Sequence, residues 1–205
     1  MNTPRLTRQS HAHDRPAVPL LGSFRLWGGR AHELCGAARR RLALWLLAEM
    51  QGPVIWIRPA WHPDRLHMAG VQTEIDPGRL IFVTPERAED LLWTMEEVLR
   101  AGAVAAVIGD LPEPPGLTPI RRLHLAAEAG VAAHGQMGLG LVLTPGAGGA
   151  AGVESRWRLE PAHESGAEAW RLTRLRARDA GPGEWRVRRD GAGRAALCDR
   201  VALPA

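Results

Sequence analysis

Lysine is absent from this chain of 205 residues, and all 26 residues counted as lysine or arginine are arginine. The absence excludes a phosphate loop of the form G-x-x-x-x-G-K-[ST] in its usual composition. In that loop the glycines let backbone N–H groups approach the phosphates, the lysine reaches the terminal phosphates, and the hydroxyl holds magnesium. A GC-rich coding sequence also produces a preference for arginine, so the arginine count alone indicates no function.

Cysteine is scarce, and long apolar runs are missing. Cys35 and Cys198 are far apart and form no C-x-x-C pair, which gives no zinc knuckle and no disulfide framework. No run approaches the roughly 20 apolar residues that span a bilayer, and the N-terminal sequence lacks the apolar core of a signal peptide. We therefore expect a cytoplasmic protein with no membrane contact, no metal and no cofactor.

The composition is otherwise that of a globular domain, since 45% of the residues are hydrophobic and can bury a sizeable core. The charge is uneven: residues 1–154 carry 15 arginines and 15 acidic residues, whereas residues 155–205 carry 11 arginines and 7 acidic residues. The net charge of +4 therefore lies in the last quarter of the chain. Such a surface either contacts nucleic acid or an acidic partner, or is a solvated face of a sheet.

Both ends of the chain look irregular. Residues 1–22 combine histidines and prolines with little periodicity, so we expect a flexible N-terminal arm. His11 and His13 form an H-x-H pair, but no apolar strand precedes them, and a polar arm explains them better than a metal site. The tail over residues 191–205 is also expected to be loose. The predicted domain covers residues 23–190, with antiparallel strands from about residue 153.

Apolar runs and helical periodicity alternate through the first two thirds of the chain. Short apolar runs predict strands, and their continuous apolar character predicts burial on both faces; they cover residues 54–57, 80–83, 103–108 and 139–143. Apolar residues at spacings of three and four, with suitable end residues, predict a helix over residues 86–102. A strongly apolar stretch predicts a buried helix over residues 42–50, and a further helix is predicted over residues 118–129, after a Pro-rich loop. The alternation predicts an α/β fold with right-handed connections and a mainly parallel sheet.

After a Gly/Ala-rich hinge over residues 145–152, apolar and polar residues alternate. This pattern predicts half-exposed antiparallel strands, with a bulge between Leu172 and Leu175 where the alternation slips. Tryptophan is frequent, with eight residues against no tyrosine and two phenylalanines. The tryptophans of these strands stand at the apolar positions of the alternation, which favours a place in the core over stacking with nucleic-acid bases. They are Trp157, Trp170 and Trp185.

The opposite face of these strands is expected to be exposed and basic. It would carry candidate contacts to DNA or to an acidic partner, namely Arg156, Arg158, Arg186 and Arg188.

With the strands placed, several segments resemble the RecA family. Glu33-Leu34-Cys35-Gly36 before an apolar helix is similar to the start of a RecA-family phosphate loop, and the strand ending at Asp110 is similar to a Walker B strand. Within this group the chain most resembles the ImuA family, RecA-like accessory proteins of a damage-inducible mutagenesis cassette that are sometimes described as SulA-like. The similarity covers roughly residues 28–189, and the segments that carry it are 28–34, 92–100, 121–128, 155–158, 175–178 and 183–185.

The resemblance implies a RecA-like core and a non-catalytic adaptor role in SOS-induced translesion DNA synthesis. The family is thought to act beside a catalytically inactive Y-family polymerase relative of the ImuB type and an error-prone polymerase. That relative is the implied partner, with RecA and single-stranded DNA as further candidates. Two alternatives stay open: a divergent DNA-dependent NTPase, and a SulA-like inhibitor of cell division.

The position of the lost lysine is informative. Alignment of the phosphate-loop pattern on Gly36 places Arg41 at the second glycine, Leu42 at the lysine and Ala43 at the hydroxyl. These substitutions remove backbone freedom, phosphate charge and magnesium coordination together. Codon bias would replace lysine by arginine and not by leucine, so the loss is local. We expect no nucleotide binding at this loop and no catalytic residue in the chain.

The arginines at the start of the same helix allow two interpretations. Arg39, Arg40 and Arg41 could grip an anion of DNA or of a partner, because guanidinium groups and helix N-terminal N–H groups both favour negative charge. Alternatively they form a solvated or acid-paired cluster, since cations at a helix N-terminus are unfavourable.

Three other sets of polar residues have simpler explanations. Asp110 would position a metal in an active relative, but without a phosphate loop we expect it to cap or end its strand. Glu96 and Glu97 point to different sides of a helix, which favours an exposed face over a carboxylate pair.

The third set has loosely ligand-like spacing. His62, Asp64 and His67 fall at or near the segment from Pro63 to Gly70. A surface loop explains this segment better than a metal site.

Overall fold

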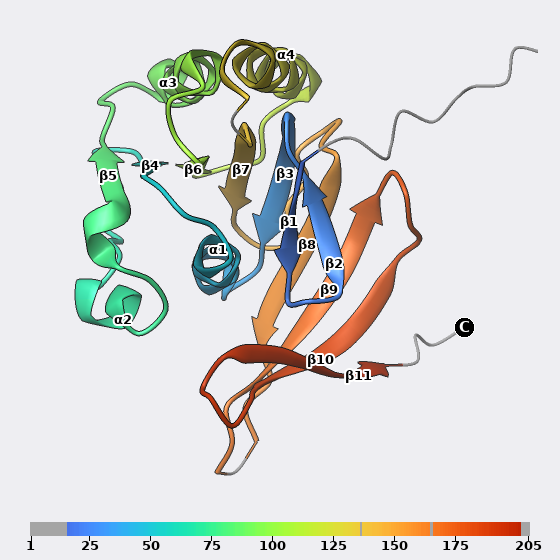
Figure 1. Cartoon of the computed structure of the whole chain (residues 1–205). Coiled ribbons are helices and arrows are strands. Elements are labelled where there is room, and N and C mark those ends of the chain that lie inside the picture. Colours follow the sequence, from blue (N-terminus) through green and yellow to red (C-terminus); the bar gives the residue numbers. More distant parts are fainter. Residues whose placement is uncertain (1–15, 136, 165, 202–205) are drawn as a thin grey trace, which may run out of the picture.

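A nine-stranded mixed sheet organises the computed structural model, which describes residues 16–135, 137–164 and 166–201. The order of the strands is β11-β10-β9-β8-β3-β7-β6-β4-β5 (Figure 1). All neighbours from β8 to β5 are parallel, and all neighbours from β8 to β11 are antiparallel. The strands are β3 (Arg30–Cys35), β4 (Val54–Ile57), β5 (Leu80–Val83), β6 (Ala106–Asp110), β7 (Leu139–Thr144), β8 (Ser155–Pro161), β9 (Ala169–Ala177), β10 (Gly183–Arg189) and β11 (Ala195–Val201).

Helices cover both faces of the parallel part of the sheet. The helix α1 (Arg39–Ala48) packs on one face, while α3 (Ala88–Ala101) and α4 (Leu117–His134) pack on the other (Figure 1). The connection through α1 leads from β3 past β7 and β6 to β4. The connections through α3, from β5 to β6, and through α4, from β6 to β7, lead across the sheet in the opposite direction. Right-handed connections in opposite directions place their helices on opposite faces. The predicted α/β fold with a mainly parallel sheet is therefore confirmed.

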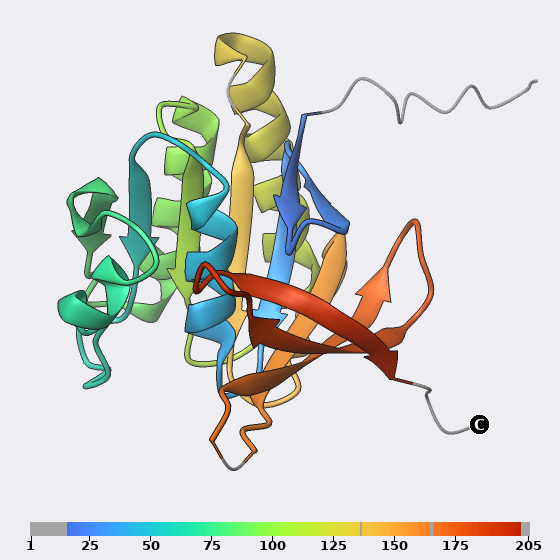
Figure 2. The same ribbon diagram turned by 60° about the horizontal axis from the view of Figure 1, so that its bottom comes forward.

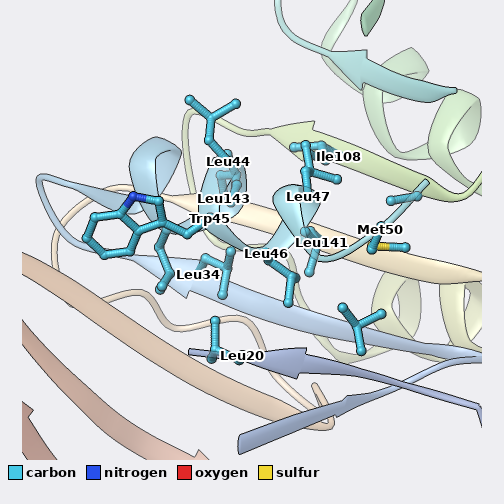
Figure 3. Packing of buried hydrophobic residues seen from close by; sticks show 14 of the residues in the cluster. Leu20, Leu34, Leu44, Trp45, Leu46, Leu47, Met50, Ile108, Leu141 and Leu143 are labelled. Carbon is cyan, nitrogen blue, oxygen red and sulfur yellow. The ribbon is translucent and has the colours of Figure 1, made fainter. Parts of the chain in front are cut away.

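The helix α1 is buried on nearly all sides. Every residue from Leu42 to Leu47 is buried, so the helix needs cover away from the sheet as well as against it. Figure 3 shows its side chains gathered with Leu141 and Ile108 of the sheet and with Leu20 of β1. This packing holds the start of α1 rigidly at the carboxyl end of β3.

The ends of the domain are more ordered than the sequence predicts. The expected arm overlaps β1 (Ala17–Leu20), which pairs with β2 (Phe24–Trp27) as a hairpin over α1. The expected loose tail contains β11, which pairs with β10. Strand β1 has four residues and β11 has seven, and in both the pairing and packing outweigh a weak sequence signal. The remaining residues of the predicted arm and tail, 1–15 with His11 and His13 and 202–205, lie outside the described residues.

Most predicted elements lie where the sequence places them. The strands β4 and β5 have the predicted bounds, while α4 extends five residues beyond the predicted end, to His134. The predicted bulge is confirmed, because Leu175 of β9 has no partner where the register with β8 shifts. The prediction that β5 is buried on both faces was wrong, because β5 is an edge strand in which Ile81 is 49% and Phe82 41% exposed. Two short helical segments were not predicted, α2 (Met68–Gln72) and the 3-10 turn η2 (Pro77–Arg79).

The antiparallel strands curve away from the parallel part of the sheet (Figure 2). Trp157 and Trp170 are each only 2% exposed and belong to the core on the α1 side, which confirms their predicted place. Trp185 is partly buried against the same cluster. Within the described ranges, no helix is both long and apolar enough to cross a membrane.

A buried histidine joins the hairpin to the sheet. His32 of β3 is 1% exposed, and its ring nitrogens lie 2.7 Å from Ser155 Oγ and 3.0 Å from the carbonyl oxygen of Trp27. Burial lowers the pKa of His32 from 6.5 to about 4, although the hydrogen bond to Trp27 opposes the shift. The imidazole is therefore neutral at pH 7 and links β2, β3 and β8.

This histidine makes stability depend on pH. Between about pH 6.5 and 4 the unfolded chain binds a proton at His32 that the folded protein does not bind. The free energy of unfolding should therefore fall as the pH drops through this window, by up to roughly 3 kcal/mol. Urea denaturation at several pH values should show a shallower pH dependence for His32→Gln than for the wild type. Equal slopes in the two proteins would contradict this assignment.

Candidate functional site

The carboxyl ends of the parallel strands form a small polar pocket. Ligands of open α/β sheets bind at this edge, where connections leave neighbouring strands in opposite directions. The pocket is lined by Arg39 and Arg40 after β3, Arg58 and His62 after β4, and Asp110 at the end of β6. It is the place where the sequence resemblance puts a phosphate loop and a Walker B carboxylate.

The loop between β3 and α1 keeps the glycine of a phosphate loop but not its free N–H groups. Gly36 has φ +91°, and a Cβ there would lie 2.5 Å from the carbonyl oxygen of Leu159, so only glycine fits. The N–H of Ala37 donates to Glu160 Oε2 at 3.2 Å, and the N–H of Ala38 donates to the carbonyl of Leu159 at 3.0 Å. Strand β8 thus occupies donors that would otherwise face a phosphate.

The three degenerate positions lie away from the pocket. Leu42 and Ala43 are completely buried in the core. Arg41 lies 3.5 Å from Glu74 Oε1, and its guanidinium stacks 5.2 Å from the ring centre of Trp170. None of the three lines the pocket at the strand ends.

Asp110 is held by arginine. Its side chain is 5% exposed, and Arg40 Nε donates to its Oδ2 at 2.5 Å, with Arg39 Nε 3.8 Å from Oδ1. Arg40 also lies 3.9 Å from the exposed Asp64. A guanidinium of the chain itself therefore supplies the positive charge that this buried carboxylate needs. The helix-start arginines are an acid-paired cluster, which is one of the two interpretations of their sequence.

Glu33 is a buried carboxylate that sequence reasoning treated only as part of a motif. It is 0% exposed and accepts hydrogen bonds from Thr144 Oγ1 at 2.6 Å, from the N–H of Gly149 at 2.8 Å and from the N–H of Ala150 at 3.1 Å. It also pairs with Arg156. The Gly/Ala-rich segment before β8 is therefore tied to β3. Strand β3 also contains Arg30 and His32, so no clear signal in its sequence indicated that Glu33 is buried.

The predicted basic face of the C-terminal strands is only partly correct. The Arg156 side chain is 19% exposed because it pairs with Glu33, and Arg158 is partly buried. Arg186 and Arg188 are about 40% exposed, but both pair with Glu164, at 2.7 and 3.0 Å. Arg158 forms no ion pair among the described residues, so two carboxylates compensate about half of the charge of these four arginines.

The remaining candidates do not form a catalytic centre. Glu96 is buried, contrary to expectation, and pairs with Arg100 and Arg122; Glu97 pairs with Arg100. Burial raises the pKa of the Cys35 thiol to about 12, with the charge of Glu33 adding to the shift, so this cysteine is not a ready nucleophile.

The loop histidines do not build a metal centre either. The ring of His62 accepts a hydrogen bond from the N–H of Asp64 at 3.3 Å, while His67 only precedes α2. Across residues 16–135, 137–164 and 166–201, no three His, Cys, Asp or Glu side chains converge on a metal position.

Comparison with known proteins adds no assignment. No protein-family model matches the chain, and no curated protein matches it significantly.

The Arg40–Asp110 pair predicts a difference between two aspartates. Asp110→Asn should lower the free energy of unfolding by about 2 kcal/mol, because it weakens a charged hydrogen bond in a buried setting. Asp64→Asn, at the exposed partner of the same arginine, should cost less than about 0.5 kcal/mol. Denaturant unfolding without any ligand measures both. If the Asp110→Asn protein were as stable as the wild type, the Arg40–Asp110 pair would not stabilise this edge of the sheet.

Proposed function

We propose that this chain is a RecA-like adaptor of the ImuA type, which has lost nucleotide chemistry and helps to assemble a lesion-bypass complex in the DNA damage response. The observation that carries the proposal is the occupied pocket at the carboxyl ends of the strands. Arg40 stands where a metal would be needed, and β8 bonds the N–H groups that would bind phosphate. A domain of this kind keeps a framework for protein contacts without an ATP cycle.

The sheet order is compatible with a RecA-like core. The strand before the phosphate-loop position, β3, is separated from the Walker-B-like strand β6 by β7. Asp110 at the end of β6 nevertheless reaches the start of α1, because both lie at the same edge of the sheet. This relation between loop, helix and carboxylate is the one that the sequence resemblance requires.

The partner class follows from the resemblance. We propose the catalytically inactive Y-family polymerase relative as the direct partner, with RecA as a further candidate. The alternative of a divergent NTPase needs an arginine free to reach a phosphate. Arg39 and Arg40 already face Asp110 and Arg41 faces Glu74, so this alternative would depend on Arg58, which lines the pocket and forms no ion pair among the described residues. We rank the adaptor role first because the three arginines at the helix start are already paired.

Co-purification tests the adaptor role. The tagged chain should retain the inactive polymerase relative from cells with induced DNA damage, and the complex should be unchanged by ATP or by removal of magnesium, because no nucleotide step is involved. A second purification with an unrelated tagged protein is the control. Failure of the two proteins to associate under these conditions would refute the role, and phosphate release in the presence of DNA would favour the NTPase.

A further inference from the structure

A second pocket lies between the hairpin and the antiparallel strands, away from the degenerate phosphate loop. In Figure 1, β2 lies beside β8 and β9, and the pocket there has a volume of about 240 Å³. This is below the roughly 300–1,000 Å³ of sites for drug-sized ligands, so the pocket fits one small planar group. Residues that line it and matter for its chemistry are Phe24, Trp27, Trp157, Arg174 and Asp179.

The pocket has an aromatic wall. The ring centres of Phe24 and Trp157 are 4.8 Å apart, and those of Phe24 and Trp185 are 4.6 Å apart. Phe24, Trp27 and Trp185 are only partly buried, whereas the equally clustered Trp157 is 2% exposed. Arg174 lies over these clustered rings, so the aromatic surface left for stacking with another planar ring is that of Trp27, which lines the pocket outside this cluster.

Arg174 lies over the clustered rings of this wall. Its guanidinium lies 5.2 to 5.7 Å from the ring centres of Trp185, Trp157 and Phe24. Its Nε donates to the carbonyl of Gly181 at 2.7 Å. Among the described residues it forms no ion pair, unlike the arginines of the phosphate-loop region. Burial lowers its pKa despite the nearby charge of Asp179, so an incoming anion would find a partly desolvated cation.

Acceptor groups complete the pocket. Asp179 Oδ2 accepts a hydrogen bond from Trp27 Nε1 at 3.2 Å and leaves its other oxygen for a further donor. Ser155 Oγ also lines the pocket, next to the neutral His32. A nucleotide has the matching groups, because its base is planar and carries N–H donors while its phosphate is anionic.

From this combination we propose that the pocket binds one unstacked base of single-stranded nucleic acid, with the adjoining phosphate on Arg174. A base inside a duplex is stacked on both faces and cannot enter. The shared chemistry is that of a nucleotide, free or within a strand. Neither the phosphate-loop region nor the polymerase partner takes part in this site. A negative result in the nucleic-acid binding test would therefore not affect the adaptor role, and a failed co-purification would not affect this site.

Fluorescence anisotropy of a labelled oligothymidylate tests the site. Arg174→Gln should weaken binding about tenfold and reduce the slope of log K against log salt by about one, because one phosphate contact is lost. Trp27→Leu should also weaken binding about tenfold, with an unchanged salt slope, because it removes stacking surface. Circular dichroism of each variant checks that the fold is retained.

Two matched controls separate this pocket from general surface effects. Arg171→Gln removes an arginine of the same strand that is 57% exposed and pairs with Glu184. Trp93→Leu removes a tryptophan of α3 that is 56% exposed. Both should bind the oligonucleotide within twofold of the wild type. A loss in either control equal to that of the pocket variants would overturn the proposal.

Competition then distinguishes the possible ligands. Displacement of the oligonucleotide by thymidine monophosphate would show that one nucleotide fills the site, and displacement only by unlabelled oligonucleotide would show that the strand is required; both results support the pocket. Equal displacement by polyglutamate would mean that only charge is recognised and would overturn the proposal. The proposal would also be overturned if Arg174→Gln and Trp27→Leu bound the oligonucleotide with wild-type affinity, or if the wild-type protein bound neither nucleic acid probe.

Discussion

The hydrogen-bonded ion pair between Arg40 and Asp110 determines what the carboxyl edge of the sheet can do. It joins the start of α1 to the end of β6, at the carboxyl edge of the parallel strands. The carboxylate is 5% exposed, so its charge needs a partner inside the protein. Because the partner is an arginine of the chain itself, the charge of Asp110 is compensated without any ligand.

The neighbouring contacts have the same effect. Glu160 and Leu159 of β8 accept the N–H groups of Ala37 and Ala38. Glu33 receives donors from β7, from the segment before β8 and from Arg156. Strand β8 is therefore fixed to both ends of the β3–α1 connection. The interactions that could bind a phosphate in a nucleotide-binding relative here hold the parallel and antiparallel parts of the sheet together.

Much of the fold could be predicted from the sequence, because its strands are apolar runs bounded by Pro and Gly and its helices have clear periodicity. The strands β4 and β5 are examples with correct bounds. The absence of a phosphate loop of the usual composition was also visible, since the chain contains no lysine. Pairing across long separations was not visible: Arg40 and Asp110 are 70 residues apart, and Ala37 and Glu160 are 123 apart. Such pairs depend on the order of strands in the sheet, which no local pattern contains.

Isothermal titration of the wild-type protein with Mg·ATP tests the central claim most directly, namely that this pocket is closed by its own side chains. The account predicts no saturable heat at millimolar nucleotide, because the carboxylate and the loop N–H groups are already bonded. Saturable binding of one nucleotide per chain, lost in Asp110→Asn, would contradict it.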